Sequence, residues 1–225
     1  MREVSRHEIK YLISLRDAEL LKHRLPALLR PDEHAEADGG YFIRSVYFDN
    51  AAFGAYNDKL SGVKERTKYR LRYYNFDPKT IFLEKKSKNG DLTGKDSARI
   101  PKGEAVAFLK GDRRLPALPG LEGELGRLRQ ADFRPVCLVD YDRFAFTYPV
   151  EDVRVTIDMD VRTAPYRTDF FDPRVLTVPV LDEGEAILEV KYNAYLPAPV
   201  RALLDGVTMQ RSAVSKYTRC LGIIE

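Results

Sequence analysis

The fold is decided by one alternating stretch, Arg66-Thr67-Lys68-Tyr69-Arg70-Leu71-Arg72-Tyr73-Tyr74. Successive side chains of a β-strand point to opposite faces, so the alternation predicts a strand with one basic face and one more apolar face. The basic face carries four side chains: Arg66, Lys68, Arg70 and Arg72. Like charges about 7 Å apart repel one another, so this face is expected either to be solvated or to meet a polyanion.

Further strands are predicted from the same alternation elsewhere in the chain. They are Arg6–Ile13, Ile43–Phe48, Ile81–Lys86, Cys137–Phe146, Val153–Val161 and Ala186–Tyr192. Three of these stretches place a glutamate and a lysine on one face, as Glu8/Lys10, Glu84/Lys86 and Glu189/Lys191. The others contribute Arg143 and a polar row with Arg154 and Asp158. The predicted sheet therefore has cationic rows interspersed with a few acids.

These charged rows allow two interpretations. On an open amphipathic sheet they would point to water, with ion pairs worth under about 1 kcal/mol each. In a closed barrel they would line a lumen, where cations need anions and carboxylates need cations. Phosphate oxygens with a bound divalent cation would satisfy both signs, so a chain of phosphates is the ligand that the pattern favours.

Helices are expected to flank the predicted sheet. Leucines recur at helical spacing over Asp17–Leu29, where Pro26 predicts a kink or an early end. Shorter helices are expected over Gly103–Lys110, Leu121–Arg129, Ala198–Leu204 and from Ser212 towards Leu221. The sequence shows no linker or repeat, so we expect one α+β domain over residues 1–225.

Composition excludes several classes of protein. The 225 residues include 37 Lys/Arg and 34 Asp/Glu, for a net charge of +3, and 44% are hydrophobic, enough for a core. No apolar run reaches the roughly 18 residues that span a bilayer, so no membrane segment is predicted. Cys137 and Cys220 are isolated, which favours a reducing, cytoplasmic location. Three scattered histidines exclude a HExxH zinc site.

Familiar catalytic motifs are absent from the sequence. The stretch Gly90–Asp96 superficially suggests a P-loop, but it has three residues between its glycines and Asp after the Lys. No GxGxxG, kinase or GxSxG motif is present. Without a convincing nucleophile, direct attack by water or by another phosphate is the expected chemistry.

Six short motifs together resemble a known family. They are Arg6-His7-Glu8-Ile9-Lys10-Tyr11, Ser45-Val46-Tyr47-Phe48-Asp49-Asn50, Lys68-Tyr69-Arg70-Leu71-Arg72, Phe82-Leu83-Glu84-Lys85-Lys86, Ile187-Leu188-Glu189-Val190-Lys191 and Ser215-Lys216-Tyr217. In this order they resemble the catalytic domain of vacuolar transporter chaperone (VTC) proteins. That domain belongs to the triphosphate tunnel metalloenzyme superfamily, also called CYTH-like. The similarity extends over almost the whole chain.

The resemblance implies both a fold and an activity. The fold is an antiparallel β-barrel of about eight strands that forms a triphosphate tunnel, with flanking helices. The activity is that of a polyphosphate polymerase, which transfers the γ-phosphate of ATP to a growing polyphosphate chain with Mn²⁺ or Mg²⁺ as cofactor. A metal-dependent triphosphate or polyphosphate hydrolase and a non-catalytic polyphosphate- or nucleotide-binding module remain the alternatives.

The resemblance also assigns residues to the site. The cations expected to hold phosphate oxygens are Lys10, Arg70, Arg72, Lys86, Arg143, Arg154, Lys191 and Lys216, joined after the Lys86 strand by Lys95 and Arg99. Glu189 is expected to be the principal metal ligand, with Glu84 and Asp158 as second acids near the metal. Lys216 would contact the terminal or acceptor phosphate.

One departure bears on the branch of the superfamily. The wider superfamily begins with Glu-x-Glu-x-Lys, whereas Arg6 replaces the first acid here, which favours the VTC-like branch. Nucleic acid is not expected as a partner, because Tyr69 and Tyr73 lie opposite the arginines and the net charge is only +3. The expected partners are ATP and polyphosphate, while oligomeric state and any membrane partner stay open.

Overall fold

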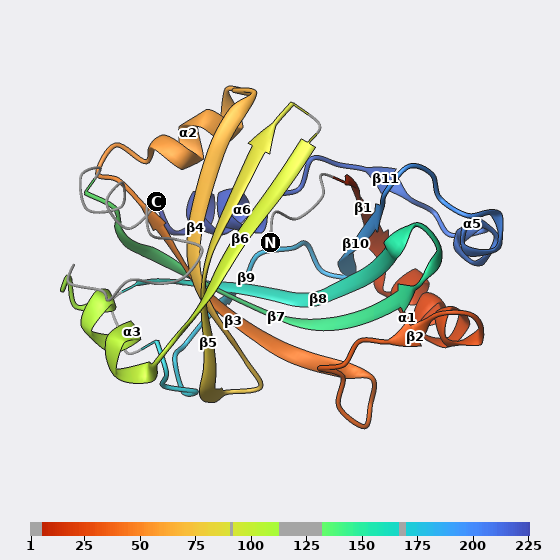
Figure 1. Ribbon diagram of the computed structural model, residues 1–225, viewed down its shortest axis with the longest axis horizontal. Coiled ribbons are helices and arrows are strands. Elements are labelled where there is room, and N and C mark those ends of the chain that lie inside the picture. The colour runs from red at the N-terminus through yellow and green to blue at the C-terminus, as the bar shows by residue number, and fades with distance from the viewer. Residues whose placement is uncertain (1–5, 91, 113–131, 167–169) are drawn as a thin grey trace.

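Antiparallel strands dominate the computed structural model, which describes residues 6–90, 92–112, 132–166 and 170–225 (Figure 1). The strands are β1 (His7–Ser14), β2 (Arg30–Pro31), β3 (Gly40–Asp49), β4 (Glu65–Tyr74), β5 (Asp77–Asn89), β6 (Leu92–Ile100), β7 (Arg134–Tyr148), β8 (Val153–Pro165), β9 (Val178–Pro179), β10 (Glu185–Tyr192) and β11 (Gln210–Arg211). The helices are α1 (Leu15–Arg24), α2 (Gly54–Leu60), α3 (Lys102–Leu109), α5 (Ala198–Leu204) and α6 (Lys216–Ile224), with short 3-10 turns η1 (Leu25–Ala27) and η2 (Val150–Asp152).

The strands form one curled sheet in the order β11-β1-β10-β8-β7-β3-β4-β5-β6, with β2 on β7 and β9 on β8. The expected antiparallel, barrel-like fold is confirmed, but backbone hydrogen bonds do not close the barrel. A side-chain contact bridges the gap instead, because Lys86 on β5 binds Glu8 on β1. Curling brings strands distant in this order close enough to share one interior.

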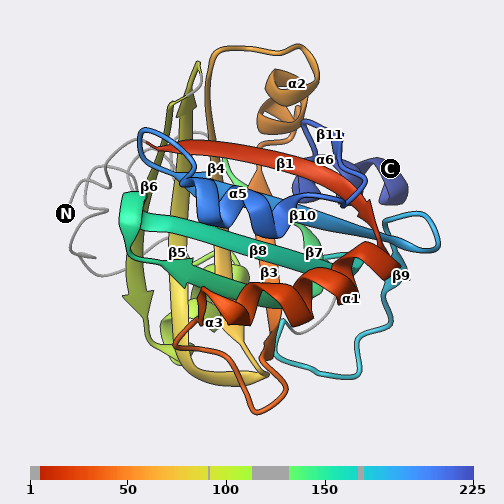
Figure 2. The same ribbon diagram turned by 90° about the vertical axis from the view of Figure 1, so that its right-hand side faces the viewer.

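Each long strand has an inner and an outer face, as the sequence predicts. On β4 the inner face carries Arg70 and Arg72, while Tyr69, Leu71 and Tyr73 on the outer face are buried in an apolar cluster with α3. A second outer cluster joins β8 and β10 to α1 and α5, which lie together on that side of the sheet (Figure 2). The polar inner face can therefore be reserved for a ligand.

Helix α6 packs on the inner face and fills one end of the barrel. Its Tyr217, Cys220 and Leu221 belong to a buried cluster with Tyr47 and Cys137. The Tyr217 ring stacks on that of Tyr47 at 5.1 Å between centroids. Ser215 caps the helix by accepting a hydrogen bond from the Thr218 amide. This cap fixes the start of α6 beside the charged strands.

The helix expected over Asp17–Leu29 is present as α1, which begins two residues earlier, at Leu15. The Ser14 hydroxyl caps the helix by accepting from the Asp17 amide at 3.0 Å. The α-helix ends at Arg24, and Pro26 lies in η1, as the expected early end requires.

All seven predicted strands are present, six with longer bounds and β1 shifted by one residue, but β6 and α2 were not predicted, nor were the short elements β2, β9, β11 and η2. Strand β6 contains Gly94, Asp96 and Ser97, so its alternation is weak in apolar residues. Helix α2 is short and is held by the Asp49 carboxylate, which accepts from the Ala55 and Tyr56 amides.

Three of the other expected helices are present in the structure, and one lies outside the described residues. Those over Gly103–Lys110 and Ala198–Leu204 correspond to α3 and α5, while α6 starts at Lys216, later than the expected Ser212. The helix expected over Leu121–Arg129 lies outside the described residues. Among the helices that the structure describes, none has the length and apolar character needed to cross a membrane.

Candidate functional site

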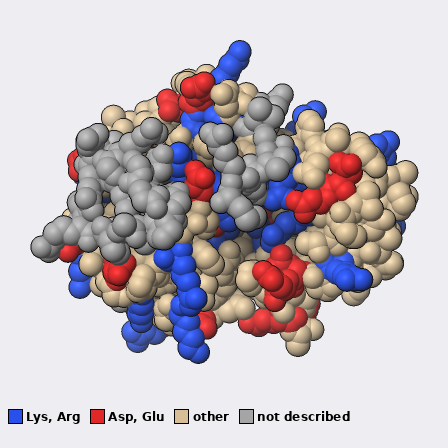
Figure 3. All heavy atoms as spheres, in the orientation of Figure 1, with Lys and Arg blue, Asp and Glu red and all other residues tan. Residues whose placement is uncertain are grey.

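A cavity of about 700 Å³ lies between the inner face of the curled sheet and the start of α6. Fifteen basic residues line it: Arg6, Lys10, Lys59, Arg66, Lys68, Arg70, Arg72, Lys86, Lys88, Lys95, Arg143, Arg154, Lys191, Arg211 and Lys216. Three acidic residues line it: Glu8, Glu84 and Glu189. Basic side chains are visible in the central hollow of the face in Figure 3. This surplus of positive charge suits a polyanion.

The structure brings together nine of the ten cations that the sequence assigned to the site. They are Lys10, Arg70, Arg72, Lys86, Lys95, Arg143, Arg154, Lys191 and Lys216. Arg99 is the exception, because its guanidinium donates to the Lys79 carbonyl at 2.9 Å, outside the cavity lining. It lies four residues beyond Lys95, which is about 13 Å along a strand. The expectation for Arg99 is therefore not supported.

Glu8 and Glu189 form the acidic centre of the cavity. Lys10 lies between them, with its Nζ 3.2 Å from a carboxylate oxygen of each. Lys191 lies 2.8 Å from Glu189 and 3.7 Å from Glu8, and Lys86 binds Glu8 at 2.7 Å. The two acids thus hold three ammonium groups from β1, β5 and β10.

This arrangement keeps the acidic centre ionised. Burial and Glu189 oppose ionisation of Glu8, yet the surrounding ammonium groups lower its pKa to about 2. Burial also opposes ionisation of Glu189, and the lysines hold its pKa well below the usual range. The pKa of Lys10 is raised despite its burial, because both carboxylates favour its charged form.

Glu84 organises a second group of cations. Its buried carboxylate accepts from Arg70 Nε at 2.6 Å and lies 2.6 Å from Lys95 Nζ and 3.8 Å from Arg72 Nη1. These charges outweigh burial and keep the pKa of Glu84 well below the usual range. Two guanidiniums from β4 and one ammonium from β6 are thereby held at one wall of the cavity.

Asp158 lies beneath the cavity and does not line it. It is fully buried, and Arg143 binds both its oxygens through Nε and Nη2 at 2.6 and 2.8 Å. Lys216 Nζ donates to the same carboxylate. Burial opposes ionisation, but Arg143 and Lys216 lower the pKa of Asp158 to about 2. Asp158 thus joins a cation from β7 to one from α6.

Lys68 is a site residue that the sequence placed in the basic row without a role. Its ammonium donates to Ser215 Oγ at 2.8 Å, and the described residues give it no carboxylate partner. Burial, followed by repulsion from Lys10 and other cations, lowers its pKa to about 7. The regular basic alternation of β4 was the signal for Lys68, whereas its contact with α6 depends on the tertiary fold.

Tyrosine rings share the cationic face, contrary to the sequence argument about stacking aromatics. The lining tyrosines are Tyr41, Tyr47, Tyr74, Tyr141, Tyr192 and Tyr217. The Tyr47 ring is buried, but its hydroxyl also accepts from Arg70 at 2.9 Å. Tyr141 accepts from Arg72 at 2.8 Å and lies beneath the Arg143 guanidinium at 5.2 Å. The hydroxyls therefore orient guanidiniums in the wall.

Comparison with known proteins places this site in a family. The family profile of the VTC domain matches residues 5–224. The chain belongs to the VTC domain family. Two curated relatives are subunit 4 of the vacuolar transporter chaperone complex of Schizosaccharomyces pombe, 30% identical over 67% of this chain, and subunit 2 from Saccharomyces cerevisiae, 30% identical over 53%. The chain spans only 24% and 18% of these relatives.

Solved structures show that this VTC domain has the triphosphate tunnel fold. A putative adenylyl cyclase from Hippeastrum, described as having a dominant triphosphatase activity, has a TM-score of 0.58 at 17% identity and covers 98% of this chain and 97% of its own. A putative adenylate cyclase from Bacillus halodurans has a TM-score of 0.51 at 13% identity, with 90% and 84% covered. At these identities the likeness establishes the fold alone.

The carboxylates at the site are the candidate ligands for a divalent metal ion. Glu8 and Glu189 present oxygens to the same cavity, and two carboxylates suit Mg²⁺ or Mn²⁺, which take further ligands from water and phosphate. Cations hold the oxygens of Glu84 and Asp158, as lysines do those of Glu8 and Glu189. Asp158 differs from the other three acids because it does not line the cavity. The described residues contain no group of three or more metal-binding side chains. Glu8, which the sequence did not assign to a metal, is a further candidate ligand because it lines the cavity beside Glu189.

Proposed function

We propose that this VTC domain is a metal-dependent polyphosphate polymerase that transfers the γ-phosphate of ATP to a growing polyphosphate chain and releases ADP. The observation that carries the proposal is the convergence of fifteen basic side chains on one cavity with three acids. Such a cavity can neutralise several consecutive phosphates. The family resemblance supplies the reaction, since a surplus of cations alone would also suit a hydrolase or a binding module.

The guanidiniums of the cavity wall are suited to gripping phosphate. Arg70 and Arg72 are oriented by Glu84 and by the hydroxyls of Tyr47 and Tyr141. Because these partners fix the guanidiniums in advance, little reorganisation is needed when charge builds on the equatorial oxygens of the transferred group. The wall therefore stabilises the transition state by position and charge.

No protein nucleophile is required for this reaction. The terminal oxygen of the acceptor polyphosphate attacks the γ-phosphorus as the bond to the ADP oxygen breaks. Lys216 and the amino end of α6 lie on the cavity and suit the terminal or acceptor phosphate, because a cation and a helix start both favour anions. A divalent cation held by Glu189 and Glu8 would neutralise charge on the phosphate oxygens.

Complex formation belongs to the same proposal. Both curated relatives are named as subunits of a vacuolar transporter chaperone complex. We therefore expect the domain to act beside further subunits of such a complex. Co-purification of a tagged chain from its native cells would test this expectation, and a consistently solitary chain would contradict it.

The test of the reaction is incubation of the protein with ATP and Mn²⁺, with ADP, orthophosphate and polyphosphate measured together. A polymerase releases ADP and forms long chains with little orthophosphate. Orthophosphate without chains would assign the hydrolase, and phosphate binding without turnover under Mn²⁺ or Mg²⁺ would assign the binding module.

A matched pair of variants ties the activity to the cavity. Arg70→Ala removes a wall cation, while Arg99→Ala removes a cation that lies outside the lining. Chain synthesis should fall at least about a hundredfold in the first variant and stay within about twofold in the second. Equal effects of the two substitutions would contradict the assignment of the cavity.

A further inference from the structure

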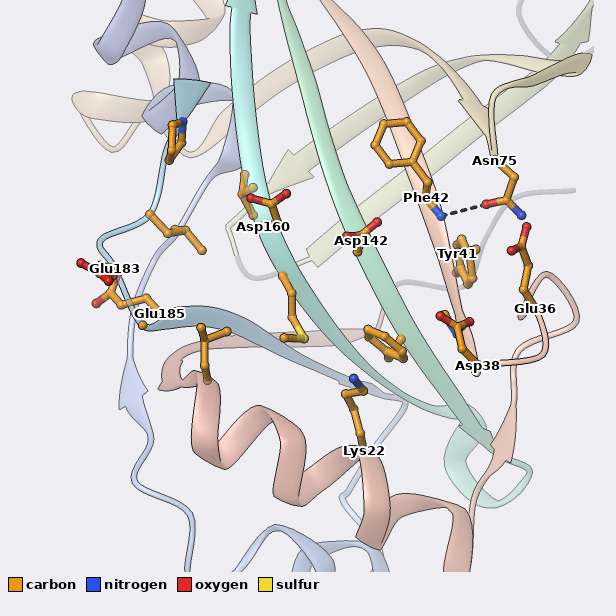
Figure 4. A pocket seen from close by; sticks show the side chains of 18 of the residues that line it. Lys22, Glu36, Asp38, Tyr41, Phe42, Asn75, Asp142, Asp160, Glu183 and Glu185 are labelled. Atoms are coloured by element: carbon orange, nitrogen blue, oxygen red, sulfur yellow. Dashed lines mark hydrogen bonds between the residues drawn. The ribbon is translucent and has the colours of Figure 1, made fainter. Parts of the chain in front are cut away.

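A second cavity, of about 690 Å³, lies on the outer face of the sheet beside α1 (Figure 4). Phe42, Asp142 and Met159 stand opposite one another on β3, β7 and β8 and line it. Asp142 and Met159 alternate with Arg143, which lines the phosphate site, and Asp158, which lies beneath it, so they point away from that site. We call this second cavity the outer groove.

The outer groove is strongly acidic. Seven carboxylates line it: Glu36, Asp38, Asp142, Asp160, Asp182, Glu183 and Glu185. Lys22 is the one basic residue in the described lining. Asp160 lies 3.3 Å from Arg162, and Glu185 lies 3.9 Å from Arg219, but no basic partner is recorded in the described part of the chain for the other five carboxylates. Burial and the neighbouring Asp160 raise the pKa of Asp142. The groove therefore has an uncompensated negative charge.

The spacing of the carboxylates favours a long cationic partner over a metal ion. Figure 4 shows Asp142 and Asp160 on neighbouring strands, with Asp38 at one end and Glu183 at the other. Nowhere in the described chain do three such groups come close enough to hold an ion. Charges spread along a groove match successive basic side chains of a polypeptide.

The floor of the groove adds an apolar component. Leu15 and Phe76 are 37% and 40% exposed, which leaves apolar surface beside the acids. Lys22 already shows how a basic side chain lies here, with its Nζ 3.8 Å above the Phe144 ring while it donates to Glu19 at 3.0 Å. A lysine of a partner could pair with a carboxylate of the groove and make an apolar contact in a similar way.

We propose that the outer groove docks a basic segment of a partner polypeptide in which Lys or Arg alternates with large apolar residues. The basic side chains pair with Asp142, Asp160 and the terminal acids, and the apolar ones cover the exposed floor near Phe76. The cationic phosphate site repels the same segment, so the two surfaces bind ligands of opposite charge. This inference does not depend on the proposed reaction.

The probe is a fluorescein-labelled peptide with three repeats of Lys-Leu-Lys-Phe, and its binding to the whole chain is followed by anisotropy at low salt. The test variant carries Asp142→Asn and Asp160→Asn. The matched control carries Glu65→Gln and Asp205→Asn, which remove the same charge from exposed positions outside the groove. A third variant, Phe76→Ala, removes an exposed part of the floor.

The dissociation constant is expected to rise about tenfold in the test variant, as for the loss of two ion pairs, and to stay within about twofold in the control. Phe76→Ala should also weaken binding, by about threefold. Equal affinities of the test and control variants would overturn the proposal. Unchanged affinity in Phe76→Ala would also overturn the proposal. It would mean that only charge is recognised, so that a small polycation without apolar side chains, such as spermine, would bind equally well.

Discussion

The Glu8 carboxylate on β1 accepts two hydrogen bonds from the Lys86 ammonium on β5, at 2.7 and 2.8 Å. These strands are not neighbours in the sheet, so the contact closes the barrel where backbone hydrogen bonds do not. The same carboxylate also contacts Lys10 and Lys191. A phosphate chain that binds these lysines must therefore compete with the acids already beside them.

Glu8→Gln should strengthen metal-free binding of tripolyphosphate. The substitution removes a negative charge from among three ammonium groups, so we expect affinity to rise about fivefold, as for one partly exposed ion pair. Titration calorimetry in the presence of a chelator measures this change. Glu65→Gln, outside the cavity, is the control, and unchanged or weaker binding in Glu8→Gln would refute the competition.

Glu189→Gln should separate turnover from binding. Loss of the principal carboxylate is expected to lower Mn²⁺-dependent turnover about a hundredfold, while metal-free tripolyphosphate binding is retained. Glu185→Gln on the same strand changes a residue that lines the outer groove but not the phosphate cavity, and it should keep full activity. Near-normal turnover in Glu189→Gln at all Mn²⁺ concentrations would show that Glu189 is not a metal ligand.

Asp158→Asn should destabilise the fold. The change leaves Arg143 and Lys216 without their shared buried carboxylate, which costs about 3 kcal/mol in the free energy of unfolding. Asp160→Asn, two residues along the same strand and largely exposed, should change it by less than about 0.5 kcal/mol. Urea unfolding compares the two, and similar midpoints would argue against a structural role for Asp158.

Low pH should lower the stability of the folded protein, because it protonates the carboxylates of Glu8 and Asp158. The pKa values of Glu8 and Asp158 are lowered to about 2 in the folded state, below their usual 4.5 and 3.8. Their contribution to stability is thus present above those usual values and is lost as the pH falls towards 2. Urea midpoints should drop between about pH 5 and pH 2.5, and less steeply in Asp158→Asn. If the urea midpoints of wild type and Asp158→Asn fell in parallel with pH, the loss of stability would not come from protonation of Asp158.

Lys68 should make phosphate binding depend on pH. With a pKa near 7, its ammonium gains a proton as the pH falls from about 8 to 6, which adds a cation to the site. The affinity ratio of wild type to Lys68→Met for tripolyphosphate should therefore rise about fivefold over this range. Using the ratio cancels the titration of the ligand itself. A ratio independent of pH would show that Lys68 does not titrate there.

Local alternation was enough to predict the long strands and their polar faces. On β4, the period-two pattern correctly separated Arg70 and Arg72 from Tyr69 and Tyr73. It did not predict β6, where Gly94 and polar residues dilute the apolar face. Sequence alternation shows which side chains share a face, but it does not show how far the sheet curls or which strands meet across it.

The pairing of charges inside the site could not be predicted, because it depends on which strands meet across the curled sheet. The resemblance placed Glu84 near the metal, yet it binds Arg70 on the neighbouring strand β4 and Lys95 on the unpredicted β6. Asp158 likewise meets Lys216 only because α6 enters the barrel. Both contacts join residues far apart in the sequence, so they depend on the assembled fold.

The most direct test of the central claim is a crystal structure of the protein with a non-hydrolysable ATP analogue and Mn²⁺. We predict the triphosphate on the inner face, with its oxygens on Arg70, Arg72 and Lys86 and the anomalous Mn²⁺ peak beside Glu189. A triphosphate bound outside the cavity, with Glu189 still paired only to lysines, would contradict the account.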